Sequence, residues 1–198
     1  LRPIVICATR EPHCLGELLL LDAVGELPGK IAAVISNHDT LRPLVERFEV
    51  PFHFLPHHEQ SREAHEHQLA KLIDIYAPEV IVLARYMRVL SDHFVDRYSE
   101  KLINIHHSFL PAFVGAAPYQ QAFERGVKVI GATAHYVTAD LDEGPIIEQD
   151  VARVNHAMDS KGLVEIGRDL EKTVLARAVK LHIRHRVLPN GPRTVVFA

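Results

Sequence analysis

The first half of the chain alternates apolar runs with helix-like segments, and this alternation limits the possible fold more than any other feature. The apolar runs predict strands at 4–8, 31–36, 51–55, 79–84 and 102–106. The segments between the first four runs predict helices at 14–24, 40–48 and 59–76. Strands separated by helices are typical of a parallel sheet whose crossover helices cover its faces.

The second half of the chain has a different rhythm. It predicts strands at 127–137 and 144–154, a long amphipathic helix at 160–185 and a short strand at 194–197. Only six residues join the first two of these strands, too few for a parallel crossover, so we expect an antiparallel hairpin. The sequence therefore predicts one α/β domain over residues 1–198, with an open, mostly parallel, Rossmann-like sheet and an antiparallel C-terminal extension.

Composition excludes several classes of protein. The formal net charge is −3, so the chain carries no overall basic footprint for nucleic acid or for an anionic membrane surface. No apolar run approaches the roughly 20 residues that a membrane-spanning helix needs. Cys7 and Cys14 are the only cysteines, which argues against a disulfide scaffold and fits a reducing compartment. We therefore expect a cytoplasmic protein with no nucleic-acid or membrane partner.

The strand at 102–106 ends in side chains that can carry chemistry. Asn104 and His106 are two residues apart, so on a strand they point to the same face. In open α/β sheets, ligands bind beyond the carboxyl ends of the strands. Spacing alone leaves two interpretations open: a functional amide–imidazole pair, or an amide bonded to a loop beside a buried histidine.

Two further segments are candidates for the same site. Asp142 lies in the link between the hairpin strands, which is either a solvated turn or a functional loop above the end of the His106 strand. His135, on the preceding strand, either orients Asp142 or is a half-buried strand residue. The segment 83–90 leaves a buried strand and stays apolar, so it either forms a wall for a flat heterocycle or packs into the core.

The motifs NIHHSFLP (104–111), FVGA (113–116), GATAHYV (131–137) and LDEGPII (141–147) resemble the folate-dependent formyltransferase family. The motifs EPHCLG (11–16), SNH (36–38) and ARYM (84–87) look specific to its formyltetrahydrofolate deformylase branch. This resemblance covers essentially the whole chain. It implies the formyltransferase fold.

The resemblance also implies roles for individual residues. The catalytic Asn, His and Asp of the family fall on Asn104, His106 and Asp142. The pterin-binding residues, which act largely through main-chain groups, fall on Met87, Arg88, Val89 and Leu90, with Thr138, Ala139 and Asp140 on the other side of the pocket. Supporting roles fall on His135, Gly115 and His38.

The implied reaction is hydrolysis of 10-formyltetrahydrofolate to formate and tetrahydrofolate, which supplies formate for one-carbon and purine metabolism. Asn104 and His106 would stabilise the oxyanion, while Asp142 would activate water and relay its proton to N10. The folate is the substrate, and no metal or prosthetic group is expected. The resemblance further implies a homo-oligomer, and a catalytic domain without the N-terminal ACT-type regulatory domain usual in this branch.

Two alternatives stay open. A phosphoribosylglycinamide formyltransferase would share the three catalytic residues but needs a phosphate site, usually a Gly-rich turn at a helix N-terminus. Here the first such turn carries Glu11 and Pro12 and has no glycine before Gly16, so water is the expected acceptor, although Arg10 could partly compensate. The other alternative is a folate-binding module without catalysis.

The chain is also rich in histidine, with 14 residues. His13, His38 and His107 are expected either to line the space that an amine acceptor would occupy or to lie in surface or packed loops. A second group could suggest a metal site, but it has no nearby cysteine and no His-Glu-x-x-His pattern. We interpret it as a solvated loop and helix face; it comprises His53, His57, His58, His65 and His67.

Overall fold

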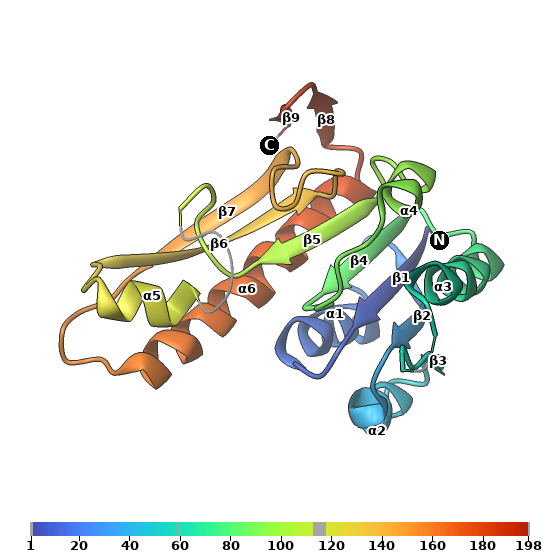
Figure 1. Cartoon of the computed structure of the whole chain (residues 1–198), viewed down its shortest axis with the longest axis horizontal. Helices are drawn as coiled ribbons and strands as arrows, with labels where there is room; N and C mark the ends of the chain where they lie inside the picture. The colour runs from blue at the N-terminus through green and yellow to red at the C-terminus, as the bar shows by residue number, and fades with distance from the viewer. Residues whose placement is uncertain (1, 59, 113–117, 198) are drawn as a thin grey trace.

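The computed structural model describes residues 2–58, 60–112 and 118–197. Within them, a seven-stranded sheet in the order β3-β2-β1-β4-β5-β6-β7 forms the centre of the molecule (Figure 1). Its strands are β1 (Pro3–Ala8), β2 (Lys30–Ser36), β3 (Phe52–Phe54), β4 (Val80–Ala84), β5 (Leu102–His106), β6 (Val129–Tyr136) and β7 (Ile146–Arg153). The first five strands pair in parallel, and β6 and β7 are antiparallel. The predicted sheet architecture is confirmed.

Helices cover both faces of the sheet because the central strands are apolar on both faces. On β1, Ile4 and Ile6 belong to a core shared with α1 (His13–Ala23), α2 (Arg42–Glu46) and α6 (Ser160–Ile183). Val5 and Cys7 of the same strand belong to a second core, shared with α3 (Arg62–Tyr76) and α4 (Asp92–Arg97). Continuous apolar strands of this kind are typical of parallel sheets.

The long helix α6 lies along one face of the sheet and connects its two halves (Figure 1). Val174, Leu175 and Val179 are fully buried in the core that includes β1 and β6. The opposite face of α6 is solvated, as predicted from its sequence. Arg168 and Arg177 make surface ion pairs there, with Glu11 and Asp150 respectively.

Short elements are where the structure departs from the sequence prediction. The helix expected at 40–48 is a 3-10 turn, η1 (Asp39–Leu41), followed by the five residues of α2. The sequence analysis missed α4 and α5 (Pro118–Glu124), which are too short to show a helical period. The short strand predicted near the end is β9 (Arg193–Val196), and it pairs with the missed strand β8 (Val187–Asn190) in a separate two-stranded sheet.

The interpretation of the histidine-rich segment is wrong for His65. Its side chain is buried, 3% exposed, and its Nε2–H donates to the carbonyl oxygen of Leu55 at 3.2 Å. α3 begins at Arg62 because the hydroxyl of Ser61 accepts a hydrogen bond from the Ala64 amide.

Among the described residues, no helix has the length and apolar composition needed to cross a membrane.

Candidate active site

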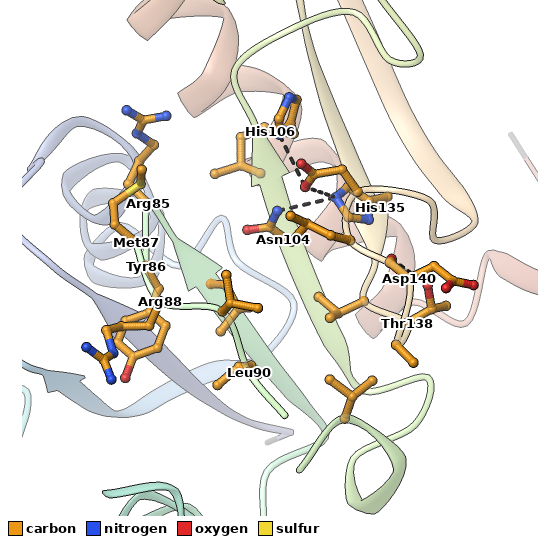
Figure 2. A pocket seen from close by; sticks show the side chains of 18 of the residues that line it. Arg85, Tyr86, Met87, Arg88, Leu90, Asn104, His106, His135, Thr138 and Asp140 are labelled. Atoms are coloured by element: carbon orange, nitrogen blue, oxygen red, sulfur yellow. Dashed lines mark hydrogen bonds and ion pairs between the residues drawn. The ribbon is translucent and has the colours of Figure 1, made fainter. Parts of the chain in front are cut away.

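A cavity of about 420 Å³ opens at the carboxyl ends of β4 and β5 (Figure 2). Most of its lining comes from three parts of the chain: the end of β5 at 104–107, the segment 85–90 that follows β4, and the link 137–142 between β6 and β7. Parallel strands bring their carboxyl ends to one edge of the sheet, and ligand sites are expected there. The antiparallel return of β6 beside β5 brings the third part to the same edge.

The cavity gathers almost all of the residues that sequence and resemblance singled out. Asn104, His106, Asp142 and His135 line it, as do the wall residues Met87, Arg88, Val89, Leu90, Thr138, Ala139 and Asp140. His38 does not line it; its ring instead accepts a hydrogen bond from Arg10 outside the cavity. Gly115 lies outside the described residues.

Asp142 is held over the end of the His106 strand. Its Oδ1 lies 3.3 Å from Nδ1 of His106 and 3.8 Å from Nε2 of His135. The side chains of Asp142 and His106 are only 13% and 6% exposed. The link between the hairpin strands is therefore more than a solvated turn, because it brings a shielded carboxylate to an imidazole.

His135 supports Asn104 more directly than it supports Asp142. The two residues face each other across β5 and β6, and Nδ2 of Asn104 lies 3.3 Å from Nε2 of His135. Burial lowers the pKa of His135, so its ring is neutral, and its Nδ1–H donates to the carbonyl oxygen of Tyr136 at 2.9 Å. Its Nε2 then accepts from the Asn104 amide, which keeps a second N–H for a ligand.

His106 presents an unsatisfied atom. Its Nδ1 faces Asp142, whereas its buried Nε2 has no hydrogen-bond partner within the described part of the chain. Leaving a buried polar atom unpaired costs free energy, so such an atom at a cavity is a candidate ligand contact. The hydrogen bond from His106 lowers the pKa of Asp142, and although burial opposes this effect, the carboxyl is ionised at neutral pH.

The interpretation of the wall at 85–90 as core is wrong for Met87 and Val89, which are 61% and 63% exposed. It holds for Leu90, which is buried in the second core together with Tyr86. The wall is fixed at its start, where the Met87 amide donates to the Thr9 hydroxyl at 3.1 Å. Exposed apolar side chains at a cavity rim are suited to a flat, partly apolar ligand.

A second cavity, about 260 Å³, lies next to the first, and His107 and Arg85 line both. Its floor is Glu171 of α6, whose carboxylate accepts hydrogen bonds from His13 at 2.8 Å and from the Tyr119 hydroxyl at 2.7 Å. His13 and His107 therefore both line this second cavity. The sequence analysis missed Glu171 and Tyr119, since Glu171 looks like one more polar residue of an amphipathic helix.

Among the described residues, His13, Cys14 and Glu171 are the group whose ligand atoms come close enough for a metal ion, all within 4.8 Å. Their charges are already balanced without one. The Glu171 carboxylate is 3.5 Å from Nε of Arg85, and burial raises the pKa of the Cys14 thiol, which keeps it protonated. Ion pairing and hydrogen bonding therefore account for this group.

Comparisons with known protein families and solved structures agree with this geometry. A family model described as formyl transferase matches residues 2–179. The glycinamide ribonucleotide transformylase 1 from Symbiobacterium toebii is 30% identical, with a TM-score of 0.95 over 100% of this chain and 95% of that one. The chain belongs to the formyl transferase family.

Similarity is higher to one branch of that family. The formyltetrahydrofolate deformylase of Escherichia coli is 55% identical over 99% of this chain and 70% of its own length, and that of Bacillus subtilis is 51% identical over 100% and 66%. The crystal structure of a deformylase from Pseudomonas syringae has a TM-score of 0.97 at 48% identity, covering 100% of this chain and 66% of that one. Within the family, the chain belongs with the formyltetrahydrofolate deformylases, of whose length it spans about two thirds.

Gly144 controls the position of the Asp142 link, and this can be tested. A Cβ at position 144 would overlap the carbonyl oxygen of Tyr136, whose backbone is already paired in the sheet. We expect Gly144→Ala to displace the link and lower turnover by about tenfold or more, because small shifts of catalytic groups are costly. Gly16→Ala is the control, since a Cβ there meets nothing within 4 Å. Equal turnover in both variants would contradict this role.

His107 should make stability depend on pH. Burial, and then the nearby Arg85, lower its pKa to about 4, whereas the unfolded chain takes up this proton near 6.5. The unfolded state therefore binds more protons between these values, and the free energy of unfolding falls as pH drops from 7 to 5. Between pH 7 and pH 5, we expect the free energy of unfolding of His107→Gln to fall by about 2 kcal/mol less than that of the parent protein.

The measurement is urea unfolding at pH 7 and pH 5. His93→Gln, at an exposed position of α4, is the matched control. If His107→Gln and the parent lose the same stability over this interval, His107 does not stay neutral in the folded protein.

Proposed function

We propose that this chain hydrolyses 10-formyltetrahydrofolate to formate and tetrahydrofolate, and that residues 1–198 act as a single catalytic domain. The observation that carries the proposal is the convergence of Asn104, His106 and Asp142 on one cavity. Relatives up to 56% identical are named formyltetrahydrofolate deformylase, which supports the same activity here. The formate released would enter one-carbon and purine metabolism.

The substrate would enter the larger cavity with its pterin ring between the two loop walls. The wall at 87–90 and the link at 138–140 offer main-chain donors and acceptors to the edges of a flat ring. Apolar side chains of Leu90, Val137 and Leu141 line the same space. This arrangement leaves N10 and its formyl group beside Asn104 and His106.

The reaction then needs an activated water, a place for negative charge and a proton for the leaving nitrogen. Water attacks the formyl carbon, and the ionised Asp142 accepts its proton. The carbonyl oxygen becomes an oxyanion, which the free amide N–H of Asn104 and, with His106 as the imidazolium ion, its Nε2–H stabilise; one such donor is typically worth about 3 kcal/mol in barrier height. The C–N10 bond breaks as the proton passes from Asp142 to N10, and the formic acid released ionises to formate.

We take the second cavity as the side where the formyl acceptor would bind. The carboxylates there favour water over a phosphorylated amine as the acceptor. The first turn of α1 follows Pro12, and Glu11 next to it forms an ion pair with Arg168 at 2.8 Å. Helix N-termini bind phosphate through free backbone N–H groups, and a carboxylate there repels a phosphate. Glu171 adds a second carboxylate to the adjoining cavity.

The proposal includes the setting of the reaction. We propose a folate as the small-molecule partner, with no prosthetic group, and a homo-oligomer in the cytoplasm. A net charge of −3 supports a partner other than nucleic acid.

The experiment is an assay of formate release from 10-formyltetrahydrofolate, with and without glycinamide ribonucleotide. We expect equal formate release in both and no formylated amine. We expect Asp142→Asn to lower kcat by about a hundredfold or more, since a positioned proton acceptor contributes 10²–10⁴, while tetrahydrofolate binding is kept. The exposed neighbour Glu143, substituted as Glu143→Gln, is the control.

Two results would overturn the proposal. Formylation of the amine without formate release would identify a transferase. Equal loss of binding and turnover in Asp142→Asn would favour a folate-binding module instead of an enzyme.

A further inference from the structure

One buried carboxylate outside the cavity takes no part in the proposed mechanism. Glu66 lies on α3, and only 7% of it is exposed. It is not among the described residues that line the larger cavity. Acidic side chains are almost never buried unless they are paired, so the partners of Glu66 indicate what it does.

Glu66 binds the residue at which the cavity wall at 85–90 ends. Its Oε1 accepts a hydrogen bond from the backbone amide of Ser91 at 2.8 Å, and its Oε2 accepts one from the Ser91 hydroxyl. Ser91 directly follows Leu90, the last residue of the wall. Hydrogen bonds to an ionised group are stronger than those between neutral groups, so this carboxylate holds the end of the wall firmly.

Ser91 is also the N-cap residue of α4, so the same contact connects α4 to α3. The Ser91 hydroxyl, which donates to Glu66, accepts a hydrogen bond from the Phe94 amide at 3.2 Å. Both helices cover the same face of the sheet (Figure 1), where they contribute to the second core. Because Leu69 and Ile73 of α3 are buried in that core, Glu66 ties the wall to a helix that is packed on the sheet.

The wall is anchored at its two ends. At its start the Met87 amide donates to the Thr9 hydroxyl at 3.1 Å, and at its end Ser91 donates to the carboxylate on α3. Between these anchors, the amides of Val89 and Leu90 have no hydrogen-bond partner within the part of the chain that the structure describes. Those amides are available to a ligand, and their positions depend on the two anchors.

We propose that Glu66 is a positioning residue for substrate binding, which by holding Ser91 places the backbone of the wall to receive the pterin ring. The inference rests on the proposed function, which puts that ring between the wall and the link at 138–140 (Figure 2). The pterin ring does not react, so contacts to it stabilise the bound substrate and the transition state equally. Loss of the anchor should therefore raise KM and leave kcat nearly unchanged.

A second partner of Glu66 defines a purely structural alternative. Nε of Arg62, one turn earlier on α3, lies 3.2 Å from Oε1 of Glu66, and the Arg62 side chain is 44% exposed. An exposed ion pair between residues i and i+4 of a helix contributes little to stability. This ion pair requires the charge of Glu66, whereas the bonds to Ser91 require its length. Two conservative substitutions therefore separate the two roles.

The experiment measures kcat and KM for 10-formyltetrahydrofolate in these two variants. Glu66→Gln keeps the length and loses the charge; its amide oxygen can still accept from the Ser91 amide, and its Nε2 can donate to the hydroxyl. We expect its KM to stay within about threefold of the wild-type value. Glu66→Asp keeps the charge but withdraws it by one methylene group, and we expect KM to rise by about tenfold while kcat stays within about twofold.

The matched control is Asp96→Asn, which removes an exposed carboxylate from α4 and should leave kcat and KM unchanged. Should Glu66→Asp fail to fold, Ser91→Ala removes one of the two bonds from the other side, and we expect its KM to rise by about threefold. An unchanged KM in whichever of these two variants is measured would overturn the inference. So would a larger effect of Glu66→Gln than of Glu66→Asp, or a fall in kcat without a rise in KM.

Calorimetric binding of tetrahydrofolate to the same proteins keeps this inference separate from the proposed function. A wild-type protein that binds tetrahydrofolate but releases no formate would overturn the proposed function. The dissociation constants of the variants would then decide the inference without turnover: a rise of about tenfold in Glu66→Asp alone supports it, and equal dissociation constants in all variants overturn it.

Discussion

The contact between Asp142 and His106 is the interaction on which the candidate site depends. It joins a loop to a strand end 36 residues earlier in the chain, and it exists because β6 returns antiparallel beside β5. A further parallel strand would have needed a crossover and would have carried the link to the opposite edge of the sheet. Both side chains are shielded from water. Removing either one would therefore leave the other as a poorly solvated polar group without its partner.

The remaining groups of the site follow from the same strand pairing. The register of β5 and β6 sets His135 opposite Asn104, and the neutral ring of His135 then fixes the amide. The proposed oxyanion donors are thus built on strands, whereas the carboxylate sits on a loop, with a left-handed backbone at Asp142 (φ 59°) that Asp tolerates better than most residues. Donors held rigidly before the substrate binds need little reorganisation during the reaction.

Sequence alone predicted the features that depend on local pattern. The apolar runs gave the sheet, the two-residue spacing put Asn104 and His106 on one face, and the short link predicted the hairpin that carries Asp142. Features that depend on packing between distant segments were missed. Glu171 and His65 occupy helix positions that look solvated in the sequence, and each is buried because another segment covers it. The partner of His135 could not be predicted either, because the choice between Asn104 and Asp142 depends on distances of a few tenths of an ångström.

Charge placement then divides the edge of the sheet into two sides. In the second cavity the carboxylate of Glu171 is satisfied by His13, Tyr119 and Arg85, and Glu11 pairs with Arg168. Both arginines that line this cavity among the described residues therefore already face carboxylates. On the side of β2 and β3, Arg10 lies beside His38, and burial followed by neighbouring cations lowers the pKa of His38 and His57. An anionic acceptor is therefore disfavoured in the second cavity, which agrees with the proposal that water is the acceptor. On this proposal, the same scaffold can separate hydrolysis from acyl transfer by the placement of charges, without altering the three residues proposed to act on the formyl group.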